Sequence, residues 1–174
     1  MKVSITAKSV PFHDEPDYAS EFFEEIGRIV ALWGRFDMQF TELVLAVSRV
    51  TEHKFDTIGP PVSLKGRLKA WRKMFNTYDR LSEFKAGALE FASAVSQSGS
   101  NRNVIMHSHW EGFDEGDPPK IRFRNVRRGG DKFLMTTYTI NLDQLVEARQ
   151  EIDNINIMLV SLFWNLGSRF GAPI

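Results

Sequence analysis

The sequence predicts an all-α fold: a bundle of about four main helices with a β-hairpin insertion near residues 120–140. Apolar residues recur at three- and four-residue steps through most of the chain, which is the period of amphipathic helices. One stretch after residue 120 changes to the alternation and the Thr, Tyr and Phe content of strands. The 174 residues show no internal repeat and no linker, so residues 1–174 are predicted to form a single domain.

The first predicted helix follows an N-terminal segment, residues 1–16, that is expected to be irregular because prolines bracket a polar run within it. Asp17 and Ser20 are both good N-cap residues, so the helix is predicted to start at one of them and to run to about Thr51. One broad apolar stripe marks it, formed by Phe22, Ile26, Ile29, Trp33, Phe36, Phe40, Leu43 and Val47.

The second predicted helix begins at Ser63, after the Gly-Pro-Pro break at residues 59–61, and ends near Tyr78. Its apolar face consists of Leu64, Leu68, Trp71 and Phe75. Its other face is basic and consists of Lys65, Arg67, Lys69, Arg72 and Lys73.

A third helix is predicted from about Ser82, with Phe84, Ala88, Phe91 and Val95 on one side. The serine- and glycine-rich stretch 96–100 forms helix poorly, so a kink or an interruption is expected just before Arg102. The following stretch, Glu111 to Pro119, is rich in glycine and proline and is predicted to be a loop.

The hairpin is predicted from two strand-like runs, around residues 121–126 and 133–140, with a Gly-Gly-Asp turn between them. The last helix is predicted to start at Asn141, with Gln144 placed as in a capping box. Its main stripe is followed by a C-terminal half that is apolar nearly all round, because further apolar residues lie opposite the stripe: Ile157, Val160 and Trp164. This half is expected to be covered by the hairpin or by a second subunit.

Composition excludes several classes of protein. The chain has no cysteine, which rules out a disulfide scaffold and a thiolate zinc site. It shows no signal-peptide pattern and no apolar run long enough to span a membrane, so a cytoplasmic protein without membrane contact is expected. The formal net charge is zero, and any nucleic-acid binding must therefore come from a local basic patch.

The segment Arg102-Asn103-Val104-Ile105-Met106-His107 resembles the active-site motif of HEPN-type ribonucleases. These are helical bundles whose catalytic members carry an arginine, often followed by a polar residue, and a histidine several residues later. Here four residues separate Arg102 from His107, and Asn103 supplies the polar residue. The resemblance implies a metal-independent endoribonuclease of the toxin or defence type, with RNA as substrate, no cofactor, and an antitoxin or another protein as a possible partner.

The residue types suit RNA cleavage without a metal. A base must remove the proton of the 2′-hydroxyl, and histidine titrates near neutral pH. A fixed cation must stabilise the charge that builds on the phosphate, and arginine grips phosphate through two parallel hydrogen bonds. We therefore expect His107 to be the general base or acid and Arg102 to hold the scissile phosphate, with Asn103 orienting His107 from one helical turn away.

Helix geometry adds a constraint on this pair. Arg102 and His107 are five residues apart, which places them about 140° apart around an ideal helix. One helix does not easily aim both side chains at one phosphate, whereas two copies across a two-fold axis can. The family resemblance implies such a composite site, and we expect a homodimer.

Other interpretations of the same residues stay open. Arg102 can instead cap a carboxylate such as Asp37, with His107 a partly buried structural histidine; the protein is then a non-catalytic HEPN module that binds a nucleotide or a protein, or a purely structural dimer. A metal between His107 and His109 is not expected, because residues i and i+2 of a helix point apart and no further ligands are close in sequence.

Basic residues also gather on the predicted hairpin. Four of them are candidate RNA contacts, namely Arg122, Arg124, Arg127 and Arg128. The alternative is a solvated edge ribbon that its charge keeps soluble.

Overall fold

The computed structural model describes residues 16–55, 59–129 and 132–171. The predicted irregular segment 1–16 lies outside the described residues except for Pro16. None of the helices within the described ranges combines the length and the hydropathy that crossing a bilayer requires. The elements in chain order are α1 (Ala19–Thr51), α2 (Leu64–Thr77), a 3-10 helix (Asp79–Phe84), α3 (Lys85–His107), β1 (His109–Asp114), β2 (Lys120–Gly129), β3 (Lys132–Asn141) and α4 (Leu142–Phe170).

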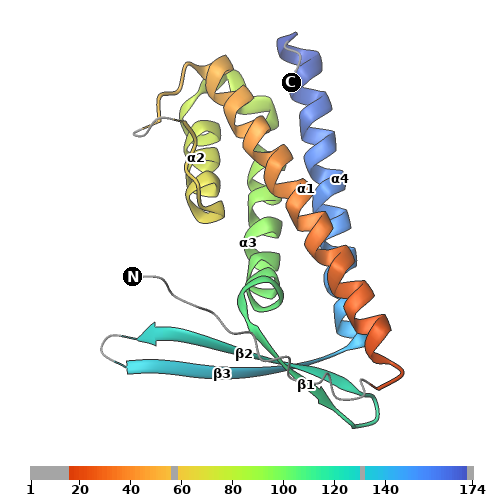
Figure 1. The fold of residues 1–174 in the computed structure, drawn as a ribbon. Coiled ribbons are helices and arrows are strands. Elements are labelled where there is room, and N and C mark those ends of the chain that lie inside the picture. Colours follow the sequence, from red (N-terminus) through yellow and green to blue (C-terminus); the bar gives the residue numbers. More distant parts are fainter. Residues whose placement is uncertain (1–15, 56–58, 130–131, 172–174) are drawn as a thin grey trace, which may run out of the picture.

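The helices form a bundle in which α1 and α4 run side by side and α3 lies between α1 and the shorter α2 (Figure 1). A three-stranded antiparallel sheet in the order β1-β2-β3 crosses the end of the bundle where α3 ends. The centre of the core is aromatic. The ring centroids of Phe40 and Phe91 lie 5.6 and 5.9 Å, respectively, from the ring centroid of Trp71. The Trp71 indole N–H donates to the Ala88 carbonyl at 2.9 Å, which ties α2 to α3.

The first strand is the main difference from the sequence prediction. Residues 109–114 form β1 and pair with β2, although the last four of these six residues were predicted to be loop. Trp110 and Phe113 pack edge-on against Phe23 of α1, which gives the strand an apolar anchor. Gly112 adopts a φ of 133° where the register shifts, so the glycine that indicated a loop instead forms an irregularity within the strand. The predicted hairpin is therefore part of a three-stranded sheet.

The expected break in the third helix is wrong. Helix α3 runs without interruption from Lys85 through the serine- and glycine-rich stretch to His107. Ser98 is buried within it and donates to the Glu151 carboxylate of α4 at 3.0 Å. The tertiary contact holds a segment that has poor helix propensity of its own. Arg102, Asn103 and His107 consequently lie on a single helix.

The last helix begins as predicted. The Asn141 side chain accepts from the Gln144 backbone N–H, and the Gln144 side chain accepts from the Asn141 backbone N–H, which completes a capping box. The hairpin does not cover the outer face of α4, where Ile157 and Trp164 remain 64% and 70% exposed. The expectation that the hairpin covers this face is therefore wrong.

A buried carboxylate links α1 to α4. Glu25 is 4% exposed and accepts hydrogen bonds from Arg28, at 3.2 Å, and from Arg149 of α4. The hydrogen bond and the charge of Glu25 raise the pKa of Arg149 above its usual value. The network neutralises a charge that would be costly to bury alone.

Replacing Arg149 with methionine is expected to lower the free energy of unfolding, because Glu25 stays buried with only Arg28 left to pair with it. The double variant Arg149→Met with Glu25→Leu should recover most of this loss, since no uncompensated charge then remains. Urea unfolding of both variants measures the difference. Equal stabilities for the single and the double variant would contradict the burial argument.

Candidate functional site

Arg102 lies half-buried in the second half of α3. Its guanidinium carbon sits 5.6 Å from the centroid of the Trp33 ring on α1, a cation–π distance. Its Nε is buried and has no hydrogen-bond partner, and no carboxylate of the described residues forms an ion pair with it. A half-buried guanidinium without a counter-ion keeps N–H donors that an anionic ligand could satisfy.

The alternative role expected for Arg102, pairing with the Asp37 carboxylate, is wrong. The Asp37 carboxylate, which the sequence offered as a partner of Arg102, pairs with Arg67 of α2. Arg67 is 5% exposed and also donates to the Val62 carbonyl at 3.0 Å. The carboxylate is therefore engaged by a cation from another helix.

Asn103 and His107 are both exposed and lie one helical turn apart. His107 is the last residue of α3, directly before the turn into β1. Within the described part of the chain, neither side chain forms a hydrogen bond. Arg102 points to Trp33 of α1 while Asn103 and His107 face solvent, in agreement with the angular separation expected for a straight helix.

Arg102 and Asn103 line one end of a hollow between α2 and α3, which we call the α2–α3 groove. Its volume is about 690 Å³. The α2 side contributes Lys65 and Arg72, two residues that the sequence placed on the basic face of a helix without assigning them to a site. The signal was present in the sequence, but nothing in it showed that this face meets the motif.

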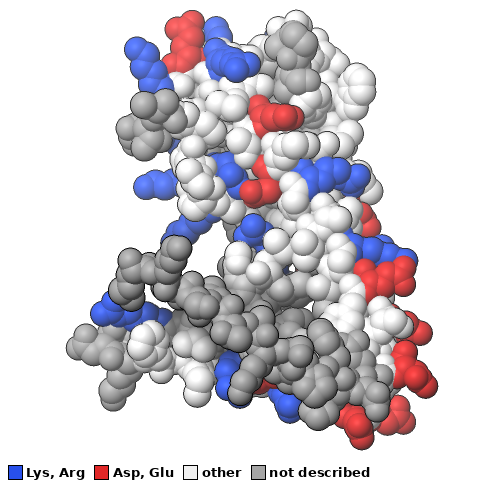
Figure 2. Space-filling view, viewed as in Figure 1, with Lys and Arg blue, Asp and Glu red and all other residues white. Residues whose placement is uncertain are grey.

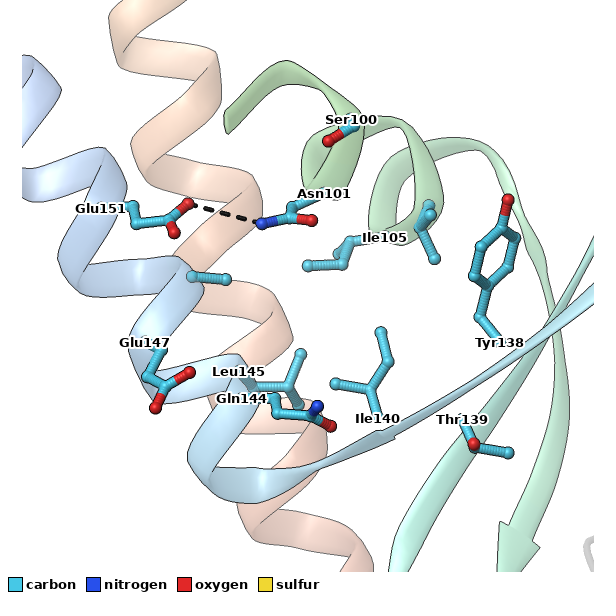
Figure 3. Close-up of a pocket in the computed structure, with 12 residues that line it drawn as sticks. Ser100, Asn101, Ile105, Tyr138, Thr139, Ile140, Gln144, Leu145, Glu147 and Glu151 are labelled. Atoms are coloured by element: carbon cyan, nitrogen blue, oxygen red, sulfur yellow. Dashed lines mark hydrogen bonds between the residues drawn. The ribbon is translucent and has the colours of Figure 1, made fainter. Parts of the chain in front are cut away.

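A second pocket lies on the opposite side of α3, between α3, β3 and α4, with a volume of about 520 Å³ (Figure 3). Ile105, Ile140 and Leu145 project into it, whereas Glu147 and Glu151 come from α4 at its edge. The Asn101 side chain donates to Glu151 at 3.4 Å. Two carboxylates make this pocket unfavourable for a phosphate.

Two of the hairpin arginines pair with carboxylates of the same sheet. Arg122 pairs with Asp114 at 2.7 Å and lies 3.8 Å from Glu111, and Arg124 also pairs with Glu111. Both carboxylates belong to β1, the strand that the sequence did not predict. Arg128 is exposed, and the Arg127 side chain lies outside the described part of the structure. Two of the four candidate RNA contacts thus already have acidic partners.

No group of three or more histidine, aspartate or glutamate side chains is placed to hold a metal ion within residues 16–55, 59–129 and 132–171. His107 ends α3 whereas His109 begins β1, so the two imidazoles belong to different elements. Among the described residues, the two histidines therefore do not form part of a preorganised set of metal ligands.

Comparison of the chain with models of protein families, with curated proteins and with solved structures finds no match. The resemblance to HEPN ribonucleases therefore rests on the six residues from Arg102 to His107 and on their helical setting.

Proposed function

We propose that this protein is a metal-independent endoribonuclease of the HEPN toxin or defence type. The observation that carries the proposal is the state of Arg102: a half-buried guanidinium, backed by Trp33, with no carboxylate partner among the described residues. It lies on the same helix as the exposed Asn103 and His107. Arg67 and Arg149, by contrast, are paired with carboxylates.

The reaction requires only these groups and the substrate. The His107 imidazole accepts the proton of the 2′-hydroxyl, and the 2′-oxygen attacks the adjacent phosphorus. The bond from phosphorus to the 5′-oxygen breaks, and that oxygen leaves with a proton from imidazolium or water. The products are a 2′,3′-cyclic phosphate and a 5′-hydroxyl. Arg102 stabilises the charge on the non-bridging oxygens, and Asn103 orients His107.

The proposed site is composite. Because α3 is continuous, Arg102 and His107 keep their angular separation, and the Arg102 guanidinium is held toward α1. A two-fold axis can bring Arg102 of one subunit to His107 of the other. The exposed apolar stripe of α4, formed by Ile157, Val160 and Trp164, is the surface that we assign to this homodimer.

Light scattering at micromolar concentration should give about twice the chain mass of 20.0 kDa. Trp164→Glu is expected to give the single-chain mass, because a charge would be buried unpaired at the interface. Val126→Glu is the control: it places the same charge on an exposed apolar residue of the hairpin and should leave the dimer intact. A monomeric wild-type protein at high concentration would remove the composite site.

The function itself is tested by incubating the purified protein with RNA in excess chelator. We expect cleavage to continue and the products to end in 2′,3′-cyclic phosphate. A substrate with a 2′-deoxy sugar at the cut position should resist, because the internal nucleophile is missing. Cleavage of the 2′-deoxy substrate would show that the mechanism is wrong. Loss of cleavage of unmodified RNA in the presence of chelator would show the same.

Two observations favour the alternative of a non-catalytic binding module. The α2–α3 groove has the volume of a small-ligand site, which suits a nucleotide. The exposed end of the hairpin, with Val126, Phe133, Leu134 and Met135, offers an apolar surface to an antitoxin or another protein partner. Nucleotide binding by protein that cleaves no RNA, even when freed of co-purified partners, would favour this alternative.

A further inference from the structure

The charge of α2 is one-sided. The helix contains five basic residues and no acidic residue: Lys65, Arg67, Lys69, Arg72 and Lys73. In Figure 2, Lys and Arg side chains lie over α2 and beside α3, whereas Asp and Glu gather around the N-terminal end of α1. Since the whole chain has a net charge of zero, this is a local concentration of positive charge.

Within the α2–α3 groove, four cationic side chains face one carboxylate. The cations are Lys65, Arg67, Arg72 and Arg102, and the carboxylate is Asp37. Arg67 takes up that carboxylate, and Arg72 donates to two neutral oxygens of α3, the Ala92 carbonyl and the Ser96 hydroxyl, each at 2.8 Å. The charges of Lys65, Arg72 and Arg102 therefore have no carboxylate partner among the described residues.

Two further features of the groove favour an anion. The Nε atoms of Arg67 and Arg102 are buried without a hydrogen-bond partner, so the protein does not fully satisfy either guanidinium. The N-terminus of α2 also lies at the groove, capped by Ser63, and its first turn has no acidic residue to offset the helix dipole. A negative charge in the groove would accept from the unpaired guanidinium groups and would interact favourably with the N-terminal end of the α2 dipole.

We propose that the α2–α3 groove holds the phosphodiester backbone of the RNA strand beside the scissile bond, with Lys65 and Arg72 as phosphate contacts. The inference rests on the proposed function for the identity of the strand as RNA. The groove leads to Arg102 and Asn103, so a strand lying in it passes the motif. The hairpin is the poorer candidate, because Glu111 and Asp114 already neutralise Arg122 and Arg124.

The dimensions favour a strand over a single ion. A volume of about 690 Å³ exceeds what one phosphate requires, and cations line the groove from α2 to the motif on α3. Spaced cations match the spaced charges of a polyanion and release its counter-ions on binding. The exposed amide of Asn103 is available for a sugar hydroxyl or a base edge.

The test uses the salt dependence of binding, measured with a labelled single-stranded oligouridylate and with His107→Ala protein so that cleavage is slow compared with the measurement. The double variant Lys65→Gln, Arg72→Gln should lower the log–log slope by about 1.4, from two lost contacts of about 0.7 each. At about 0.1 M salt this corresponds to about 25-fold weaker binding. The matched control, Arg122→Gln with Arg124→Gln, removes the same charge from the hairpin and should leave the slope unchanged.

Two single variants guard against a folding artefact. Lys65 is exposed and has no hydrogen bond to another described residue, so Lys65→Gln should lower the slope by about 0.7 without changing the melting temperature. Asp37→Asn removes the carboxylate of the groove and should tighten binding, the opposite sign to the other variants. An unchanged slope in the Lys65 and Arg72 variants, or a loss confined to the hairpin control, would overturn the inference.

The outcome separates this inference from the proposed function. If the protein binds the oligouridylate through the groove but cleaves no RNA, the groove assignment stands and the ribonuclease proposal fails. If cleavage depends on His107 while the groove variants bind and cleave as the wild type does, the ribonuclease proposal stands and the groove assignment fails.

Discussion

Replacing His107 with alanine is expected to lower the rate of RNA cleavage by about 10²–10⁴-fold, the usual contribution of general acid–base catalysis. The affinity for RNA should hardly change, because the base acts in the transition state and the exposed His107 adds little to ground-state binding. Single-turnover cleavage and equilibrium binding on the same variant separate the two quantities. His109→Ala is the matched control, since His109 is exposed two residues away on β1 and has no assigned role.

Substitutions of Arg102 should differ from those of His107. Arg102→Ala is expected to weaken both binding and rate, because a phosphate clamp acts on the bound substrate as well as on the transition state. Arg102→Lys should restore binding better than rate, since an ammonium keeps the charge but loses the paired donors of guanidinium. An Arg102→Ala protein with wild-type rate and affinity would show that the unpaired guanidinium only packs on Trp33.

Co-expressing the Arg102→Ala and His107→Ala chains is expected to restore activity that neither variant has alone. If each site takes Arg102 from one subunit and His107 from the other, a mixed dimer contains one intact site and one doubly defective site. Mixed dimers make up about half of a random mixture, so activity should return to about one quarter of the wild-type value.

The same experiment has clear negative outcomes. Each variant co-expressed with itself should stay inactive, which controls for residual turnover. Adding Trp164→Glu to both chains should abolish the restored activity, because it disrupts the proposed α4 interface. An inactive mixture whose subunits demonstrably exchange would place Arg102 and His107 of a single chain in each site, and would exclude the composite arrangement.

The sequence by itself determined the helices and the position of the motif. Helix periodicity and capping depend on neighbours three and four residues away, so the courses of α1, α2 and α4 could be predicted from local pattern alone. The N-cap predicted for α1, Asp17 or Ser20, is wrong, because Tyr18 occupies that position without a side-chain cap. The capping box of Asn141 and Gln144 is such a local signal. The placement of Arg102 and His107 on a helix likewise followed from the sequence, although the uninterrupted course of α3 did not.

Only the tertiary structure decided which groups meet across the fold. The Asp37 carboxylate pairs with Arg67, thirty residues away, whereas the sequence had suggested Arg102 as its partner. Strand β1 exists because Trp110 and Phe113 find an apolar partner on α1, and it brings Glu111 to Arg124.

The α2–α3 groove arises in the same way, since it needs the basic face of α2 beside the motif on α3. Contacts of this kind join residues far apart in the chain, and their free energy depends on burial that the whole fold creates. A sequence pattern carries no record of that burial, and for this reason it identified Arg102 but not the cations that line the same groove.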